Sequence, residues 1–563
     1  MGKKHIGFIL FFETAIIGAV SLGAGITGGF VLSKAVHLLL LRLAQAPVQW
    51  GFYFSGKAAL MSVLLYGTVF LLILAGNLAR VHVSSPVELL RGGQEGEREP
   101  KTRWWIAIIG TAALGGGYYL AVATSNPAYA ISAFFYAAIL VMIGTYCLFT
   151  AGSIALLKLL KKKKGFYYRT EHFISVSGLL YRMKQNAAGL AGICILSTSV
   201  LVMLSSTVAL YVGMDDVTRN RYPRNILLEA VHASPADEAV IAGAVQEVLS
   251  ANGLGEENHL SYSDLSLLAV EEKPGVFDIK TTYTTADLEK IQPMYVMTQE
   301  DYGRVTGNQA KLSEGQCMVV TQYSPYEEDS LTVLGRTYQA VPAGDYGLWD
   351  GADTFGSEVY YLIVPDDEEM QLLEAGQQAG EGGRVSSIRY HYGFDLDTDQ
   401  DTQIRIYNEI MHKASVIPEG IQGESAAEGR ASYFSLNAGL LFLGIFLGTL
   451  FVMATVLIIY YKQVTEGYDD KSRFEIMQKV GMSKSEVKKT IRKQVLMVFF
   501  IPLVMAGIHI LAAFKMITRL LQVFMMYNVS LFAICTIGTF VVFAVIYAIV
   551  YAVTAREYYK IVG

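Results

Sequence analysis

The sequence predicts an α-helical polytopic membrane protein with one α/β domain inserted between its membrane helices. Of 563 residues, 52% are hydrophobic and the mean hydropathy is +0.36, which is too apolar and too long for one soluble domain. Eight stretches approach the roughly 20 apolar residues that a bilayer span requires. Residues 213–432 hold 38 of the 50 acidic residues but only 14 of the 45 basic ones. This asymmetry indicates an acidic aqueous domain set into apolar segments with basic edges.

The predicted spans divide around the acidic region: five lie in residues 1–212 and three in residues 433–563. They are Thr14–Leu41, Ala58–Leu78, Trp104–Val122, Ile131–Leu157, Leu190–Val212, Ala438–Tyr460, Val495–Leu521 and Val529–Val553. The Lys and Arg residues of the short loops fall on one side of this arrangement, and a cytoplasmic excess of these residues sets orientation. We therefore expect a multi-pass membrane protein with both termini in the cytoplasm and residues 213–432 on the opposite side of the membrane.

The acidic region shows mixed periodicity. Alternating apolar residues predict strands at 317–323 and Val359–Val364, and helical spacing predicts helices at 236–250, 366–375 and 402–413. About 200 residues is an ordinary size for one domain. Cys317 is its only cysteine, which excludes a disulfide within the domain.

Residues 462–494 form a polar stretch between two long apolar segments, with nine basic and five acidic residues. The pattern predicts two short helices. Phe474, Met477 and Val480 share a face of the first, and Gly481 can end it in a left-handed cap. Ser483-x-x-Glu486 is a capping box that starts the second, which continues into the next apolar run. Such a segment suits a lever that transmits movement; a solvated loop beside the membrane is the alternative.

Two short motifs resemble ligand sites without fitting them. Residues 51–57 match most of a phosphate-binding loop, but no Ser or Thr follows Lys57 and no strand precedes it. Asp395-x-Asp-x-Asp-x-Asp401 resembles a calcium loop, but its sixth and twelfth positions are Gln400 and Ile406, so an acidic cap for the next helix is the better account. No nucleophile–base pair or zinc motif is recognisable. We expect no enzyme activity, no cofactor, no bound metal and no nucleic-acid partner.

Small and ionisable residues within the apolar segments predict helix packing and candidate contacts. Gly25-x-x-x-Gly29 and Gly444-x-x-x-Gly448 allow close approach of helix backbones. Ionisable groups inside spans usually face protein or water, which makes Lys34, His37 and His509 candidate ligand contacts. For Lys34 and His37, extension of the side chain to the outer headgroups is an equal alternative.

An ungapped internal match aligns residues 482–494 with residues 1–13. Each is a short basic helix that enters a long span, with Lys3, Lys4 and Glu13 in the first copy and Gln494 opposite Glu13. Repeats of this kind are typical of transporter halves. Only the second copy, residues 482–494, is preceded by a further helix and a complete span. We therefore expect upstream spans to be missing here, through a start site assigned too far downstream, truncation or a naturally short form.

Three short segments of the sequence resemble a known family. The segment from Phe474 to Met482, FEIMQKVGM, is similar to the signature of FtsX-like permeases, where a Glu-Ile pair shortly before a Gly leads into the next helix. Residues 85–93 (SPVELLRGG) and 181–187 (YRMKQNA) resemble segments of the bacitracin-resistance branch, the BceB-like permeases. The single large domain before the last three spans also fits that branch. Members have ten spans, so the first two would be absent here.

The resemblance implies the membrane subunit of an ABC transporter that protects Gram-positive bacteria from peptide antibiotics that bind cell-wall lipid precursors. It implies two copies of a separate cytoplasmic ATPase and signalling to a membrane histidine kinase. Phe474, Glu475, Met477, Val480, Gly481 and Met482 would then couple to the ATPase, with Lys3, Lys4 and Glu13 as a second copy. The acidic domain would meet the drug or its lipid complex. A signalling scaffold that does not transport is the alternative, and the domain's position after the fifth span disfavours a macrolide or lipoprotein exporter.

Overall fold

The computed structural model describes residues 3–43, 54–83 and 103–562. It leaves out 125–126, 163–164, 166–169, 281–282, 285–286, 288–289, 309–310, 323–324, 344–347, 349–357, 380–385, 418–419 and 480–483. The chain divides into two compact units, Met1–Lys101 and Thr102–Gly563. Across the described residues eight helices are long and apolar enough to cross a membrane, one for each predicted stretch.

The first unit is a pair of long helices, α1 (Lys3–Leu43) and α2 (Gly56–Val83), that pack against each other. Their closest approaches use glycine. A Cβ at Gly7 would lie 3.2 Å from Leu78, and one at Gly18 would lie 3.4 Å from the ring of Phe70. Farther along the pair, the helices leave a pocket of about 590 Å³.

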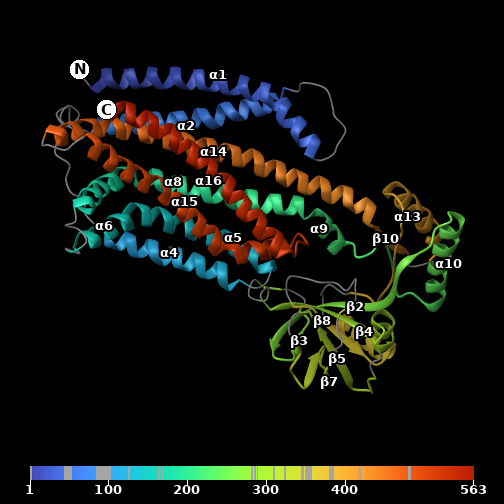
Figure 1. Cartoon of the computed structure of the whole chain (residues 1–563). Coiled ribbons are helices and arrows are strands. Elements are labelled where there is room, and N and C mark those ends of the chain that lie inside the picture. The colour runs from blue at the N-terminus through green and yellow to red at the C-terminus, as the bar shows by residue number, and fades with distance from the viewer. Residues whose placement is uncertain are drawn as a thin grey trace. The chain divides into compact units, whose positions relative to one another are not determined.

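The second unit contains a bundle of long helices that run side by side (Figure 1). Its members are α4 (Trp104–Ala123), α5 (Pro127–Cys147), α6 (Ser153–Lys162), α8 (Thr170–Val212), α14 (Ala426–Lys479), α15 (Lys484–Gln522) and α16 (Val529–Val562). A π-helical turn, Leu148–Gly152, joins α5 to α6 inside the predicted fourth span. A Cβ on Gly110 would lie 2.7 Å from the Cβ of Cys147, which shows how closely α4 and α5 pack.

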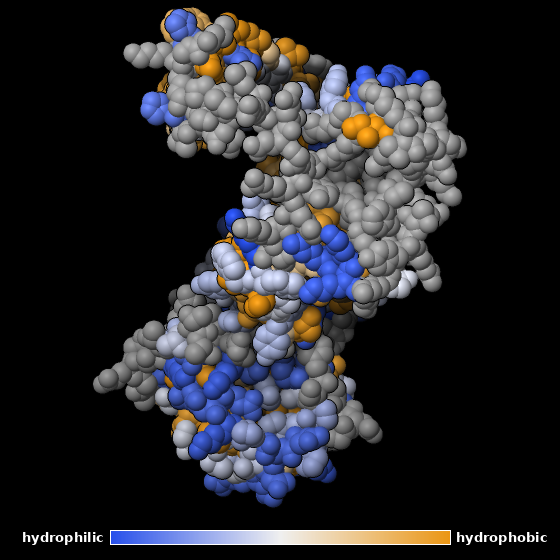
Figure 2. Space-filling view, turned by 90° about the vertical axis from the view of Figure 1, so that its left-hand side faces the viewer, coloured by the Kyte–Doolittle hydropathy of each residue, from blue (hydrophilic) through white to orange (hydrophobic). Residues whose placement is uncertain are grey.

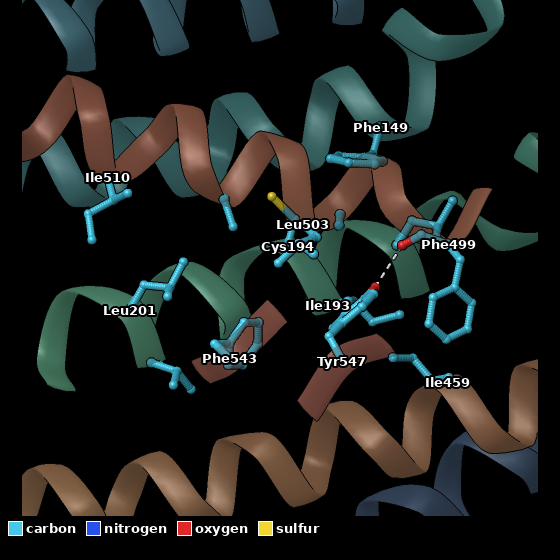
Figure 3. Close-up of a cluster of buried hydrophobic side chains, with 14 of the residues drawn as sticks. Phe149, Ile193, Cys194, Leu201, Ile459, Phe499, Leu503, Ile510, Phe543 and Tyr547 are labelled. Carbon is cyan, nitrogen blue, oxygen red and sulfur yellow. Dashed lines mark hydrogen bonds between the residues drawn. The ribbon is translucent and has the colours of Figure 1, made fainter. Parts of the chain in front are cut away.

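The bundle core forms where α8, α14, α15 and α16 meet (Figure 3). Its side chains come from all four helices and include Leu201, Ile459, Leu503 and Phe543, each less than a tenth exposed. Cys194 is buried among them as a free thiol. Because these helices are long and apolar along most of their surface, packing against one another determines which stripe is buried.

The inserted domain, here called the insert, is an α/β domain built on one ten-stranded sheet in the order β10-β1-β9-β2-β3-β6-β7-β5-β8-β4. Its strands are β1 (Ile226–Val231), β2 (Glu257–Lys273), β3 (Val276–Asp278), β4 (Ile291–Thr298), β5 (Gln316–Thr321), β6 (Ser330–Val333), β7 (Arg336–Val341), β8 (Tyr360–Val364), β9 (Arg389–Asp395) and β10 (Ile421–Ser425). Its helices are α9 (Met214–Arg221), α10 (Pro235–Ala251), α11 (Gln299–Thr306), α12 (Asp367–Ala379) and α13 (Gln400–Ala414).

Strand β2 belongs to two parts of the insert. Its first half pairs with β9, and its second half pairs with both β4 and β3. The second pairing closes the strands β2 to β8 into a small barrel, because β4 also pairs with β8. Closure removes the exposed sheet edges that invite aggregation. The remaining strands β10, β1 and β9 form an open sheet that packs on α10 and α13 through residues such as Ile241 and Ile406.

The structure confirms an α/β insert and places its elements close to the predicted ranges. The two predicted strands are β5 and β8, and the three predicted helices are α10, α12 and α13. The side chain of Asp399 accepts a hydrogen bond from the backbone N–H of Thr402, so the acidic stretch caps α13 as predicted. One boundary differs: α14 begins at Ala426, so the last seven residues of the range 213–432 assigned to the domain already belong to this helix.

Candidate functional site

The predicted coupling segment spans the junction between α14 and α15. The first of its two predicted helices is wrong as a separate element, because residues 462–479 continue α14 without a break. The second is part of α15 and runs into the apolar segment as expected. Phe474, Glu475 and Met477 lie in the last turns of α14, and of these three residues the structure describes only the backbone. Val480, Gly481, Met482 and the capping Ser483 lie outside the described residues.

The segment begins on α14 at residues 462–466, here called its base on α14, and the base is buried. Gln463 and Glu466 are 5% and 8% exposed, and Lys462 Nζ lies 3.9 Å from Glu466 Oε1. These polar side chains line a small space together with Leu190, Phe499 and other apolar residues of α8, α15 and α16. At the residue after Glu466, a Cβ on Gly467 would touch Ile561 of α16 at 3.4 Å. The helix therefore leaves the core at a point held by three neighbours, as a rigid lever requires.

The base on α15 is fixed by an aromatic cluster. Phe499 lies between the rings of Tyr547 and Tyr551, with centroids 5.1 and 4.9 Å away. The hydroxyl of Tyr547 donates a 2.8 Å hydrogen bond to the carbonyl of Phe499 (Figure 3). Pro502, inside the same helix, has no N–H for the carbonyl four residues earlier, so the helix ladder is interrupted beside this contact. Neighbouring side chains that bond to the backbone make such a proline tolerable in a membrane helix.

The second predicted coupling copy lies in α1, which begins at Lys3. Under the ungapped match, this position falls opposite Lys484, where α15 begins. Lys3 and Lys4 are described by backbone only, and Glu13 is exposed.

Of the candidate ligand contacts, His509 has the most structured surroundings. It is 3% exposed, and its ring nitrogens lie 2.7 Å from the hydroxyl of Tyr118 and 3.1 Å from that of Thr145. These residues come from α15, α4 and α5 and form the polar side of an otherwise mostly apolar pocket of about 330 Å³. Sequence alone identified His509 only, because its partners lie 391 and 364 residues away.

The other predicted packing and contact residues differ in their surroundings. Lys34 is half-buried and His37 exposed, and neither is among the described residues that line the α1–α2 pocket. Gly25 and Gly29 do line it, but a Cβ on either would meet nothing within 4 Å, so the predicted close approach does not occur between α1 and α2. On α14 the backbone is closer to its neighbour. A Cβ at Gly444 would overlap Thr207 of α8, and one at Gly448 would lie 3.2 Å from Leu204.

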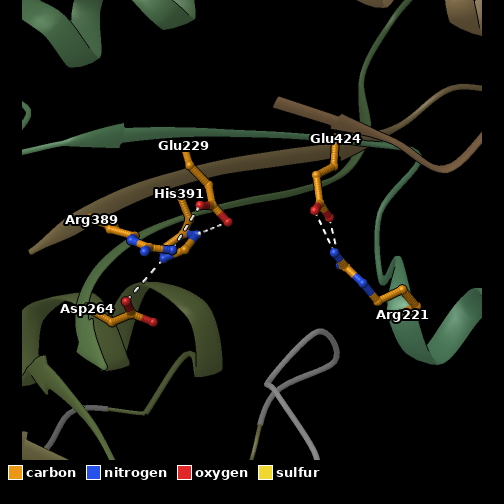
Figure 4. A network of polar contacts seen from close by, with 6 residues as sticks. All are labelled: Arg221, Glu229, Asp264, Arg389, His391 and Glu424. Atoms are coloured by element: carbon orange, nitrogen blue, oxygen red, sulfur yellow. Dashed lines mark hydrogen bonds and ion pairs between the residues drawn. The ribbon is translucent and has the colours of Figure 1, made fainter. Parts of the chain in front are cut away.

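The insert contains a buried charged cluster that sequence reasoning missed (Figure 4). Nε2 of His391 lies 3.1 Å from Asp264, and Nδ1 lies 3.5 Å from Glu229, which also faces Arg389 at 3.4 Å. Burial alone would lower the pKa of His391, but the two carboxylates outweigh it and raise this pKa to about 10. The His391 ring, 3.5 Å away, lowers the pKa of Glu229. The cluster joins β1, β9 and the midpoint of β2, and so fixes the sheet to the barrel.

The face of the insert visible in Figure 2 is mostly polar, whereas most of the exposed large apolar side chains of the described chain belong to the long helices. Among the described residues no group of three or more His, Cys, Asp or Glu could hold a metal ion. The described chain thus offers a buried segment of α14, a mostly apolar pocket with a buried histidine among the membrane helices, and an acidic aqueous domain, and no assembled catalytic centre is evident among these features.

Comparison with known proteins gives a consistent result. Residues 445–561 match the family described as FtsX-like permease C-terminal. The ABC transporter permease protein YxdM of Bacillus subtilis (strain 168) is 26% identical over 524 residues, which cover 89% of this chain and 76% of that protein. The bacitracin export permease protein BceB of the same strain is 21% identical over 90% of this chain and 78% of its own length. BceB of Halalkalibacterium halodurans is 24% identical over 95% and 84%.

The fold and these matches define a multi-pass membrane permease with an inserted aqueous domain. More specifically, residues 445–561 carry an FtsX-like permease domain, and the chain is similar over most of its length to ABC transporter permeases. Proteins of this class are transporter subunits and not themselves enzymes, and the class implies a partner ATPase.

Proposed function

We propose that the chain is the permease subunit of an ABC transporter that protects a bacterium from, and senses, peptide antibiotics directed at the cell wall. Its ATPase is a separate subunit, and its membrane topology has eight spans with both termini in the cytoplasm. Two of the relatives above carry bacitracin export in their names, which supports the choice of substrate class. The insert carries the excess of acidic residues, and such a surface attracts cationic peptides at long range.

The observation that carries the proposal is the buried base of residues 462–494. Both helices that lead into this segment are held in one core, α14 by Lys462, Gln463 and Glu466 and α15 by Phe499 and Tyr547. A helix anchored in this way transmits displacement of its outer end to the bundle. The outer turns, with Phe474 and Met477, would receive the ATPase.

The coupling role is tested by co-purification. Phe474→Ala combined with Val480→Ala should reduce the amount of ATPase that purifies with the permease several-fold while membrane insertion stays normal. Tyr468→Ala is the matched control, because Tyr468 is a 67% exposed residue of the same helix and helical spacing places it on the face opposite Met477. Equal recovery of ATPase with the double variant and with the control would contradict this role.

The substrate class is tested by drug sensitivity. A sensitive strain that expresses the full-length gene with its ATPase should tolerate several-fold more bacitracin or lantibiotic than a strain in which the ATPase cannot hydrolyse ATP. An unchanged inhibitory concentration for both drugs would reject protection as the function.

A second candidate is an ATP-driven signalling scaffold that controls a membrane histidine kinase or a cell-wall hydrolase without transport. A helix-to-insert connection through α8 and α14 would serve this function equally well. Drug-dependent activation of a kinase reporter in the absence of protection would favour the scaffold over the transporter.

A further inference from the structure

Helix α9 holds the insert close to the bundle. It follows α8 directly, and its Arg221 forms a two-pronged ion pair with Glu424 of β10, at 2.7 and 2.5 Å (Figure 4). The next residue, Tyr222, covers Gly429 at the start of α14, where any Cβ would overlap its ring. The backbone N–H of Ala426 donates to the carbonyl of Asn225 at 2.8 Å. The chain connects bundle and insert twice, at residues 222–225 and at residues 426–429, and these two segments contact each other next to α9.

Other residues of α9 contact the turn between α15 and α16, residues 523–528. The side chain of Asn528 donates to Asp216 at 2.9 Å, and that of Asn220 donates to the carbonyl of Met525 at 3.0 Å. Val217 is fully buried against an apolar cluster that includes Leu521. One short helix thus contacts both the last strand of the insert and the far end of α15.

The α15–α16 turn has a backbone that depends on such contacts. Met525 has a φ of 59°, a left-handed conformation that is unfavourable for a residue with a side chain and persists only when its surroundings impose it. Asn220 bonds to the carbonyl of this same residue. Asn528 uses its other amide atom to cap α16 through the N–H of Leu531, so its contact with Asp216 also fixes the start of that helix.

We propose that α9 is a mechanical relay between the insert and α15. Movement of β10 displaces Arg221, and α9 passes the displacement through Asp216 and Asn220 to the α15–α16 turn. Because α15 has 39 residues and rises about 1.5 Å per residue, it would carry the movement roughly 58 Å to Lys484. Only the last step, from Lys484 to an ATPase, rests on the proposed function.

Hydrogen exchange on the full-length chain in nanodiscs tests the relay without ATPase or drug. Arg221→Gln should increase exchange about threefold to fivefold in β10 and also in residues 523–528, the range expected for loss of a half-exposed ion pair. Asn220→Ala should act in the reverse direction, because coupling between two sites is reciprocal: exchange should increase in the turn and in β10. Arg405→Gln is the control, since it breaks an exposed pair with Glu409 within α13.

If α9 is a relay, Arg221→Gln and Asn220→Ala each increase hydrogen exchange both in β10 and in residues 523–528. The control Arg405→Gln leaves exchange in residues 523–528 unchanged. Combining Arg221→Glu with Glu424→Arg restores wild-type exchange. The relay is overturned if Arg221→Gln changes β10 alone, or if Asn220→Ala changes the turn alone. Should Arg221→Gln fail to fold, Asn220→Ala decides the question. These outcomes are independent of drug protection, so failure of the relay and failure of the proposed function are distinguishable.

Discussion

Replacing His391 by glutamine removes the cation that separates two carboxylates inside the insert. His391 is 8% exposed, and its ring stacks on Tyr262 with centroids 4.8 Å apart, so no water can replace the lost charge without rearrangement. Removing one partner of a buried ion pair typically costs about 3–5 kcal/mol. Arg389 remains 3.4 Å from Glu229 and is 46% exposed, which compensates in part. We expect the free energy of unfolding of the insert to fall by about 2–3 kcal/mol.

The same residue predicts a pH dependence with a definite sign. The pKa of His391 is raised to about 10 in the folded insert, against about 6.5 in an unfolded chain. The contribution of charged His391 to the free energy of unfolding is therefore complete below pH 6.5. It is lost as the pH rises toward 10, because His391 releases its proton at a lower pH in the unfolded chain than in the folded insert. Wild-type stability should decrease between pH 7 and pH 9.5, and His391→Gln should remove most of that decrease.

The assay uses Cys317, which is fully buried in β5 and is the only cysteine of the insert. Full-length protein in nanodiscs is equilibrated in urea at each pH, and alkylation of Cys317 is quantified by mass spectrometry of its peptide. His232→Gln is the matched control, because His232 pairs with Glu374 at 2.7 Å but its side chain is 42% exposed. Equal urea midpoints for the two variants, or a wild-type midpoint that does not change with pH, would refute the role of His391.

Three further predictions concern the membrane helices. Gly444→Ala should lower the thermal stability of the solubilised protein by about 1–3 kcal/mol, because the new methyl overlaps Thr207, whereas Gly439→Ala, with open space around it, should not. A normal melting temperature for Gly444→Ala would contradict the close α8–α14 packing. Tyr547→Phe should cost about 1 kcal/mol in the same assay through loss of its bond to Phe499, with Tyr146→Phe, half exposed on α5, as the control; equal melting temperatures would dismiss that bond as an anchor. For topology, an impermeant maleimide applied to whole cells should label Asp397→Cys and not Lys560→Cys, both exposed positions; labelling in the reverse pattern would invert the proposed orientation.

The membrane part was accessible to sequence reasoning because bilayer spans require long apolar runs, and each of the eight predicted runs lies in a long helix. The α/β class of the insert followed from residue periodicity in the same way. The continuity of α14 through residue 479 was not predicted. Local signals such as the polar composition after Tyr460 favour a break, whereas burial of Gln463 and Glu466 against α8, α15 and α16 favours one continuous helix.

By itself the sequence determined the number and limits of the apolar segments, the acidic insert and the position of the polar segment 462–494, because each depends on composition or on neighbours along the chain. Only the tertiary structure decided which polar residues meet. His509 with Tyr118, His391 with Asp264 and Arg221 with Glu424 are pairs separated by 391, 127 and 203 residues. No local sequence pattern predicts such a pair, because its two residues are brought together only by the packing of whole helices and strands.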